Sequence, residues 1–275
     1  MKRFLLLLSF VGAGAQADEP VLKREDLPLW EVGVAAAGIS QQAYPGSDQQ
    51  ARRALALPYL IYRGKVLRAD GDGAGLRAVR TDSFELDVSF AGSLSSGSEV
   101  LRAREGMARL GTLVEAGPVA RWFVNGRGAG DRITFELPLR GVFEARNPSR
   151  HRGMSVEPRL SWQHRPKADG LGYGLSVGAL LGDRRLGSTF YGVAPGEARP
   201  DRPAFDARAG LIAWRLGGSV GTSLTPDLRV YAFGRVDSLA GAANRDSALV
   251  RQSTGFSYGI GLSYTLMRSA ARASD

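Results

Sequence analysis

The chain has 275 residues and no cysteine, and its 36 Lys and Arg against 27 Asp and Glu give a formal charge of +9. Disulfides therefore cannot stabilise it, and its 36 glycines and 13 prolines favour many turns over long helices. This length suits one domain or a single barrel.

The first residues predict export. Lys2 and Arg3 precede an apolar run, Phe4 to Val11, and Ala15-Gln16-Ala17 follows as a small-residue cleavage site. The run is shorter than the about 20 residues that span a bilayer, so a membrane anchor is the weaker alternative. We predict a signal peptide over residues 1–17 and a periplasmic lead-in over 18–28. Export argues against nucleic acid as the partner of the basic chain.

Strands with two different faces follow the lead-in. The clearest is Arg132 to Glu144, where apolar Ile133, Phe135, Leu137, Leu139 and Phe143 alternate with Thr134, Glu136, Arg140 and Glu144. A period of two places these sets on opposite faces of one strand.

The same alternation recurs along the chain, and no window shows a convincing helical period. The segments with an apolar face are Trp30 to Ala37, Leu55 to Ile61 (with Leu57 and Tyr59), Phe84 to Phe90, Val114 to Val124, Val156 to Gln163, Gly172 to Leu181, Phe205 to Ala213, Leu228 to Asp237 and Phe256 to Leu266. Turn residues separate them, for example at Asp70 to Gly75 and Asn147 to Gly153. We predict an all-β fold: an antiparallel up-and-down transmembrane β-barrel of about twelve strands over 29–267, with a polar tail over 268–275.

A secreted β-sandwich is the soluble alternative, because its outer faces would also be polar. Two features favour the barrel. The polar faces carry Gly, Ser and opposite charges, which suit a narrow wet interior, and aromatic residues recur toward the strand ends, as in the two girdles at membrane interfaces. In lipid only a closed barrel satisfies every backbone group of such strands.

The charged residues of the polar faces are the candidate site, as residues that line the lumen. They are Glu31, Glu85, Asp87, Glu115, Arg121, Glu136, Arg140, Glu144, Glu157, Arg159, Arg229, Arg235 and Asp237. Adjacent strands bring opposite signs within reach of one another. We favour a lumen filled by cross-barrel ion pairs, and the alternative is a charge-lined path for small solutes.

Other chemistry has little support. His151 with Ser155 and Glu157 is the one cluster to weigh as catalytic, and its position across a turn between Arg150 and Arg152 argues for an exposed loop. Asp70-Gly71-Asp72-Gly73 lacks the Glu that completes a calcium loop. We expect no catalytic residue, no cofactor and no metal site.

Several segments resemble the MipA/OmpV family, that of the MltA-interacting protein. They are Tyr44-Pro45-Gly46-Ser47-Asp48, Ala56 to Gly64, Ser188 to Val193, Arg251-Gln252-Ser253 and Gly259 to Tyr264. Their order along the chain, more than any single motif, carries the resemblance. One departure is the polar tail after Met267, because family members tend to end on an aromatic residue.

The resemblance implies an outer-membrane barrel of a Gram-negative bacterium. The founding member is described as a scaffold between a lytic murein transglycosylase and a peptidoglycan synthase, and other members are linked to adhesion or solute passage. We therefore expect a non-enzymatic scaffold whose partners are a periplasmic murein hydrolase and synthase, with a narrow channel for small solutes as the alternative. The many arginines suit lipopolysaccharide phosphates or an acidic lumen, although Arg-rich codon usage explains them equally well.

Overall fold

The computed structural model describes residues 27–63, 67–70, 73–93, 101–166 and 170–273. The predicted signal peptide lies outside the described residues, as does the predicted lead-in up to residue 26. Among the residues that the structure describes, no helix is long and apolar enough to cross a membrane.

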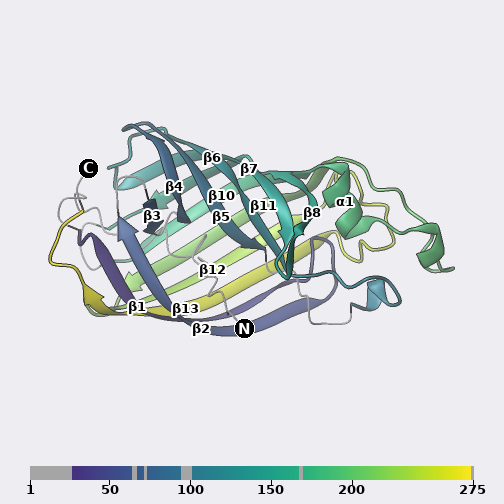
Figure 1. Ribbon diagram of the computed structural model, residues 1–275, viewed down its shortest axis with the longest axis horizontal. Helices are drawn as coiled ribbons and strands as arrows, with labels where there is room; N and C mark the ends of the chain where they lie inside the picture. Colours follow the sequence, from purple (N-terminus) through teal and green to yellow (C-terminus); the bar gives the residue numbers. More distant parts are fainter. Residues whose placement is uncertain (1–26, 64–66, 71–72, 94–100, 167–169, 274–275) are drawn as a thin grey trace.

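A single antiparallel sheet closes on itself to form a barrel (Figure 1). Its strands are β1 (Trp30–Gln42), β2 (Gln50–Arg63), β3 (Leu67–Asp70), β4 (Gly73–Arg80), β5 (Phe84–Ser93), β6 (Leu113–Phe123), β7 (Asp131–Glu144), β8 (Asn147–Val156), β9 (Arg159–His164), β10 (Gly172–Gly182), β11 (Gly210–Ser223), β12 (Leu228–Ser238) and β13 (Thr254–Arg268). Pairing of β1 with β13 joins the first strand to the last, and pairing of β10 with β11 completes the ring.

The wall has twelve strands, because β8 and β9 are two parts of one strand. Both lie between β7 and β10, and only Glu157 and Pro158 separate them. Proline has no N–H for the ladder, which explains the break. Elsewhere, successive strands are neighbours, so the predicted antiparallel up-and-down barrel of about twelve strands is confirmed.

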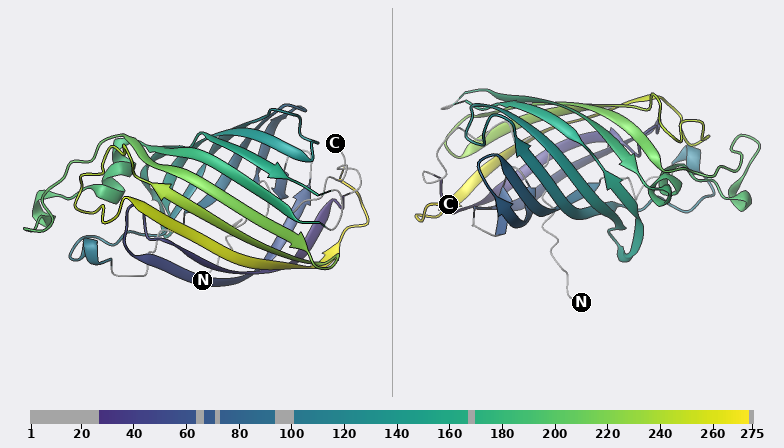
Figure 2. Two further views of the ribbon diagram at one scale, coloured as in Figure 1. Left: turned by 180° about the vertical axis from the view of Figure 1, so that it is seen from behind. Right: turned by 90° about the horizontal axis from the view of Figure 1, so that it is seen from above.

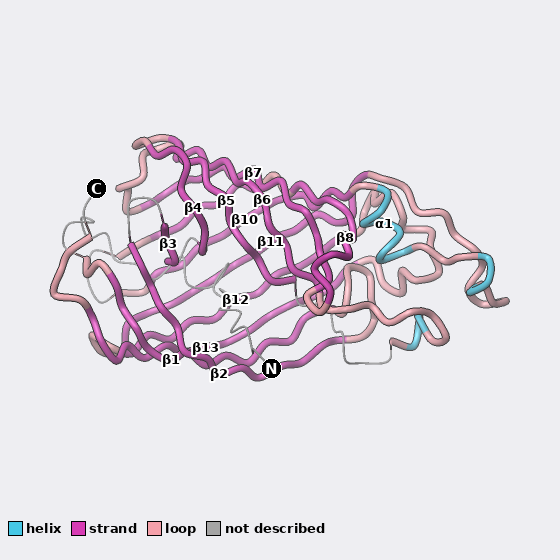
Figure 3. Tube along the Cα trace, viewed as in Figure 1, coloured by secondary structure: helices cyan, strands magenta, loops and turns pink. Residues whose placement is uncertain are grey.

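The two ends of the barrel differ (Figures 2 and 3). The loop end carries the long connections, with helix α1 (Arg184–Tyr191) and the 3-10 turns η3 (Arg102–Arg104) and η4 (Pro195–Glu197). The turn end carries short turns and brings residues 27–29 beside 269–273. There Leu29 N donates to Ala271 O at 2.8 Å, and Ser269 N donates to Trp30 O at 3.0 Å. The segment after β13 therefore continues the sheet.

Strand β7 has the two faces predicted from its alternation. Phe135, Leu137 and Leu139 are exposed on the outside, whereas Thr134 and Glu136 are buried inside. An apolar outer face and a polar inner face are what a transmembrane barrel presents to lipid and to its lumen.

Strand β2 is oriented opposite to our prediction, because Leu55, Leu57, Tyr59 and Ile61 belong to its inward face. Tyr59 Oη lies 2.7 Å from Thr265 Oγ1, and a Cβ at Gly33 would lie 2.7 Å from the Tyr59 ring. The outward residues, such as Ala54 and Leu60, are also apolar. Alternation carries no information where both faces are apolar, and pairing with β1 decides the orientation.

Three predicted boundaries are wrong. The predicted connection Asn147 to Gly153 is strand β8, because the ladder to β7 continues as far as the pair of Glu144 with Asn147. Strand β11 begins at Gly210 and not at Phe205, which instead pairs with Val193 in a loop bridge. The predicted turn Asp70 to Gly75 includes the start of β4.

Helix α1 contradicts the expectation that no helix is present. It has only eight residues, including Gly187, Ser188 and Thr189, so helix propensity does not identify it. Local and tertiary contacts stabilise it: the Asp183 side chain accepts a 2.7 Å hydrogen bond from Leu186 N. Gly153, at φ 128°, lets the backbone of β8 approach this N-terminus, where a Cβ would lie 2.4 Å from Leu186 N.

We expect Asp183→Ala to destabilise α1 by about 0.5–2 kcal/mol, because it removes the N-cap acceptor. The change should appear as faster amide hydrogen exchange in residues 184–191. Exchange in β7 should be unchanged, and equal acceleration in both regions would contradict a local capping role.

Candidate functional site

A row of alternating charges crosses the inner wall from β5 to β9. Glu85 pairs in register with Arg121, Arg121 with Glu136, and Glu136 with Arg159. Residues directly opposite each other in an antiparallel sheet point to the same side, so the row faces the interior. Register thus brings together predicted residues that are far apart in the sequence.

Arg121 is the centre of this ionic cluster. Its Nε donates to Glu136 Oε1 at 2.8 Å, and its Nη1 lies 2.7 Å from Asp87 Oδ2 and 3.4 Å from Glu85 Oε1. Arg159 also donates to Glu136. The side chains of Arg121 and of its three carboxylate partners are at most 6% exposed, so the whole cluster is removed from solvent.

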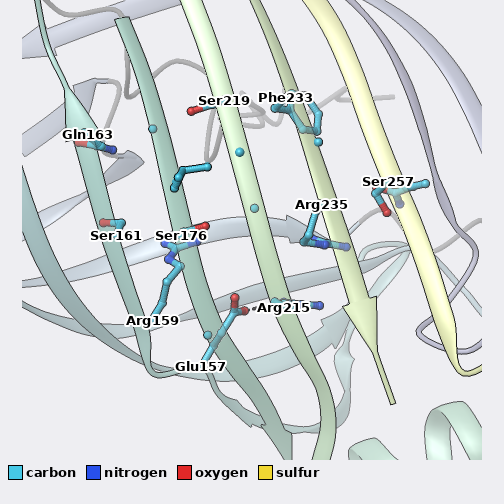
Figure 4. A pocket seen from close by; sticks show the side chains of 17 residues that line it. Glu157, Arg159, Ser161, Gln163, Ser176, Arg215, Ser219, Phe233, Arg235 and Ser257 are labelled. Atoms are coloured by element: carbon cyan, nitrogen blue, oxygen red, sulfur yellow. Dashed lines mark hydrogen bonds and ion pairs between the residues drawn. The ribbon is translucent and has the colours of Figure 1, made fainter. Parts of the chain in front are cut away.

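A second cluster lies between β9 and β12. Arg215 Nη1 donates to Glu157 Oε2 at 2.6 Å, and its Nε lies 3.5 Å from Asp237 Oδ1. Arg235 Nε lies 3.0 Å from the same Asp237 oxygen. This cluster borders a cavity of about 120 Å³ on the inner wall (Figure 4).

The other predicted residues form separate contacts. The pairs are Glu31 with Arg63 at 2.7 Å, Glu115 with Arg140 at 3.5 Å and Glu144 with Arg152 at 2.5 Å. Arg229 makes no ion pair with any residue that the structure describes. The predicted set is thus divided among several ionic groups along the barrel.

Four arginines of these groups were not among the residues predicted from the sequence. Arg63, Arg127, Arg152 and Arg215 each pair with a predicted carboxylate. Arg215 had a detectable signal, because it alternates with Trp214 and Leu216, both exposed on the outside. Arg152 lies in the predicted turn Asn147 to Gly153, and Arg63 lies just beyond the predicted apolar face Leu55 to Ile61.

A hydrophobic core closes over the loop end, and we call it the cap. Its buried residues come from the loop-end connections and from the adjoining strand ends. They are Ala43, Tyr44, Leu101, Leu110, Leu113, Val142, Leu180, Leu186, Phe190, Tyr191, Ala207, Ile212, Ala213, Leu239 and Ala242. The cap is thus a hydrophobic packing unit at one mouth of the barrel, separate from the ionic clusters on the inner wall.

Two tyrosines tie the loops of the cap together. Tyr44 Oη donates to Leu249 O at 2.7 Å, and Tyr191 Oη donates to Pro45 O at 2.9 Å. Arg104 Nη1 donates to Phe190 O at 3.0 Å. Four loop-end connections therefore share one set of buried contacts.

Burial raises the pKa of Tyr44 to about 12, although the nearby Arg104 guanidinium opposes the shift. Burial also raises the pKa of Tyr191. A free tyrosine titrates near pH 10. Because the folded pKa lies above the unfolded value, the neutral phenol stabilises the cap fully below about pH 10, and this contribution is lost as the pH rises through 12.

We therefore expect the cap to loosen between about pH 10 and pH 12. Absorbance at 295 nm should show a late-titrating tyrosine fraction, and Tyr44→Phe should remove one phenol from it. If all tyrosines titrate together near pH 10 while the cap remains protease-resistant, the stabilising role of the buried phenols in the cap is contradicted.

The residues considered for catalysis are not assembled. His151 packs against Phe143, with ring centroids 5.3 Å apart, and Glu157 binds Arg215. His151, Ser155 and Glu157 make no hydrogen bond to one another in the described part of the chain. No group of three or more His, Asp or Glu residues there could hold a metal ion.

Comparison with protein-family models decides the family. The model of the MltA-interacting protein MipA matches residues 32–266, nearly the whole barrel. The chain belongs to the MipA family. This confirms the resemblance predicted from the sequence motifs. None of the curated proteins matches the chain.

Three solved structures illustrate what this MipA-family chain is similar to. The NanC porin has 11% identity and a TM-score of 0.42, and the match covers 85% of this chain and the whole of the porin chain. The outer membrane protease OmpT from Escherichia coli has 8% identity and a TM-score of 0.29, covering 88% of this chain and 97% of its own. Neisserial surface protein A has 12% identity and a TM-score of 0.19, covering 86% of this chain and 97% of its own. The barrel assignment rests on strand pairing and not on these similarities.

Proposed function

We propose that this protein is a non-enzymatic outer-membrane scaffold of a Gram-negative bacterium, and that it binds peptidoglycan-remodelling enzymes in the periplasm. The observation that carries the proposal is a barrel cross-linked inside and covered at one mouth. The Arg121 cluster joins β5, β6, β7 and β9, and the cap packs loops over the opening. Such a body is suited to a rigid support in the membrane.

Its orientation follows from the lengths of its connections. Outer-membrane barrels have short periplasmic turns and longer extracellular loops. The turn end would then face the periplasm, where murein hydrolases and synthases act, and the cap would face outward. The family name, MltA-interacting protein, supports a murein enzyme as partner.

Lipid would surround the wall and lipopolysaccharide the loop end. Exposed arginines at this end include Arg102, Arg150, Arg184 and Arg245, whose side chains are 62–77% exposed. Guanidinium groups bind phosphate bidentately, so lipid A phosphates fit this surface.

A pull-down tests the scaffold. The detergent-solubilised barrel, immobilised on resin, should retain a lytic transglycosylase from periplasmic extract, detected by murein zymography and mass spectrometry. An unrelated outer-membrane barrel is the matched control. Equal retention by both barrels would contradict the scaffold role.

A narrow solute channel is the second candidate, and the cavity beside Arg215 is the observation that favours it. Proteoliposome swelling and single-channel recording test it with the wild type and an Arg140→Ala, Arg159→Ala double variant. A channel predicts conductance steps that the double variant changes. Absence of steps in both proteins would exclude a channel.

A further inference from the structure

The cavity lies where inward side chains are small. The inner faces of β9 to β13 line it, with Gln41 from β1, and five of the lining residues are glycines. Figure 4 shows Arg159, Glu157 and Arg215 near one side, and Arg235 beside Ser257. Because glycine and serine fill little space, these strands leave a hollow beside the ionic clusters.

Strand register aligns one row of residues across the cavity, and most of them carry a hydrogen-bonding side chain. Ser161 opposes Ser176, Ser176 opposes Gly217, Gly217 opposes Arg235, and Arg235 opposes Ser257. Opposed residues share a face, so the Arg235 and Ser257 side chains are direct neighbours inside the barrel.

The charged lining is cationic. Arg159, Arg215 and Arg235 line the cavity with one carboxylate, Glu157, so these residues carry a net +2. Arg159 and Arg215 donate to Glu136 and Glu157. Arg235 differs from both, because Asp237 contacts only its Nε and its side chain is 39% exposed. Its two terminal nitrogens have no partner among the described residues.

Ser257 provides an independent indication of a ligand. The residue is 6% exposed, it lines the cavity, and its hydroxyl oxygen has no hydrogen-bond partner. A buried polar group without a partner costs about 1–3 kcal/mol. A ligand hydroxyl or carboxylate in the cavity would satisfy it.

We propose that this cavity binds a small hydroxycarboxylate, with the carboxylate on Arg235 and a hydroxyl group at Ser257. A planar guanidinium matches a carboxylate through two parallel hydrogen bonds. Glu157 and Asp237 beside the site disfavour a dianion such as phosphate. A cavity of about 150 Å³ holds benzene, so this one suits a ligand of about six heavy atoms.

Equilibrium binding of glycerate to the purified full chain in detergent, measured by calorimetry, tests the proposal. Arg235→Gln should weaken binding at least about tenfold, because it removes a charge-assisted hydrogen-bond pair. Ser257→Ala should weaken it several-fold. Arg229→Gln is the matched control on the same face of β12, outside the cavity lining, and should bind as the wild type does.

Neutral glycerol should bind at least about tenfold more weakly than glycerate. If glycerol binds equally well, if phosphate binds as tightly with the same dependence on Arg235, or if Arg235→Gln leaves affinity unchanged, the proposal is overturned. Heat-modifiable gel migration verifies that each variant is folded, and Ser257→Ala decides the question if Arg235→Gln fails to fold. Glycerate binding is measured independently of enzyme retention and of solute passage. A negative result for the scaffold or the channel would therefore not change the outcome of the binding test.

Discussion

Replacing Arg121 with alanine is expected to lower the free energy of unfolding by about 3–5 kcal/mol. Arg121 contacts Glu85, Asp87 and Glu136, all buried in the barrel. Without it, these carboxylates share one cation fewer, so their burial is less compensated. Urea unfolding in detergent, followed by tryptophan fluorescence, measures the loss.

A second substitution separates loss of the ion pair from loss of packing. Glu85 keeps Arg127 at 2.7 Å and Glu136 keeps Arg159, whereas the 2.7 Å contact of Asp87 Oδ2 with Arg121 Nη1 is lost. We expect Arg121→Ala with Asp87→Ala to recover part of the stability, because the buried carboxylate is removed. A double variant less stable than the single one would contradict this explanation.

Arg229→Ala is the control for the Arg121 experiment. Arg229 also lies on a strand, in β12, but makes no ion pair with the residues that the structure describes. Arg229→Ala should lower the free energy of unfolding by much less than Arg121→Ala does. Similar losses at both positions would show that the Arg121 cluster has no special role.

Tyr191→Ala is expected to open the cap while the barrel wall remains folded. The ring is 1% exposed and packs on Tyr44 with centroids 6.4 Å apart. Truncating a buried aromatic residue destabilises its core by about 3–5 kcal/mol. Because the cap contacts lie at the loop end, trypsin should cleave segment 183–209 faster, at Arg184, Arg185 or Arg208.

Tyr191→Phe is the matched variant, because it keeps the ring and removes only the hydrogen bond to Pro45 O. Its cost should be about 0.5–1.5 kcal/mol, with little change in cleavage. Heat-modifiable migration should persist in both variants. Loss of heat-modifiable migration in Tyr191→Ala, or cleavage as slow as in the wild type, would contradict a separate cap.

Prediction from the sequence succeeded where the two faces of a strand differ strongly. In β7, apolar residues alternate with Thr134, Glu136 and Arg140, and one orientation alone keeps the charges off the outer face. The predicted orientation was wrong in β2, where Leu57 and Leu60 lie on opposite faces and either orientation exposes apolar residues. Orientation can therefore be predicted from the sequence only where one face of the strand is apolar and the other is charged.

The candidate residues could be named from alternation, but their partners could not. Arg121 meets Glu136 because β6 and β7 pair in one register, and a shift of one residue would move either side chain to the other face. The cap was also beyond prediction, because Tyr44 and Tyr191 are 147 positions apart and make contact only when the loops fold together. Helix α1 depends on those same contacts.

The sequence alone determined the wall of this protein and its family, because a two-residue period and ordered motifs are local properties of the chain. The tertiary structure decided which charges pair, which face of β2 points inward, and that a hydrophobic cap covers one mouth. These features depend on strand register and loop packing between distant residues, and such contacts form only when the sheet closes.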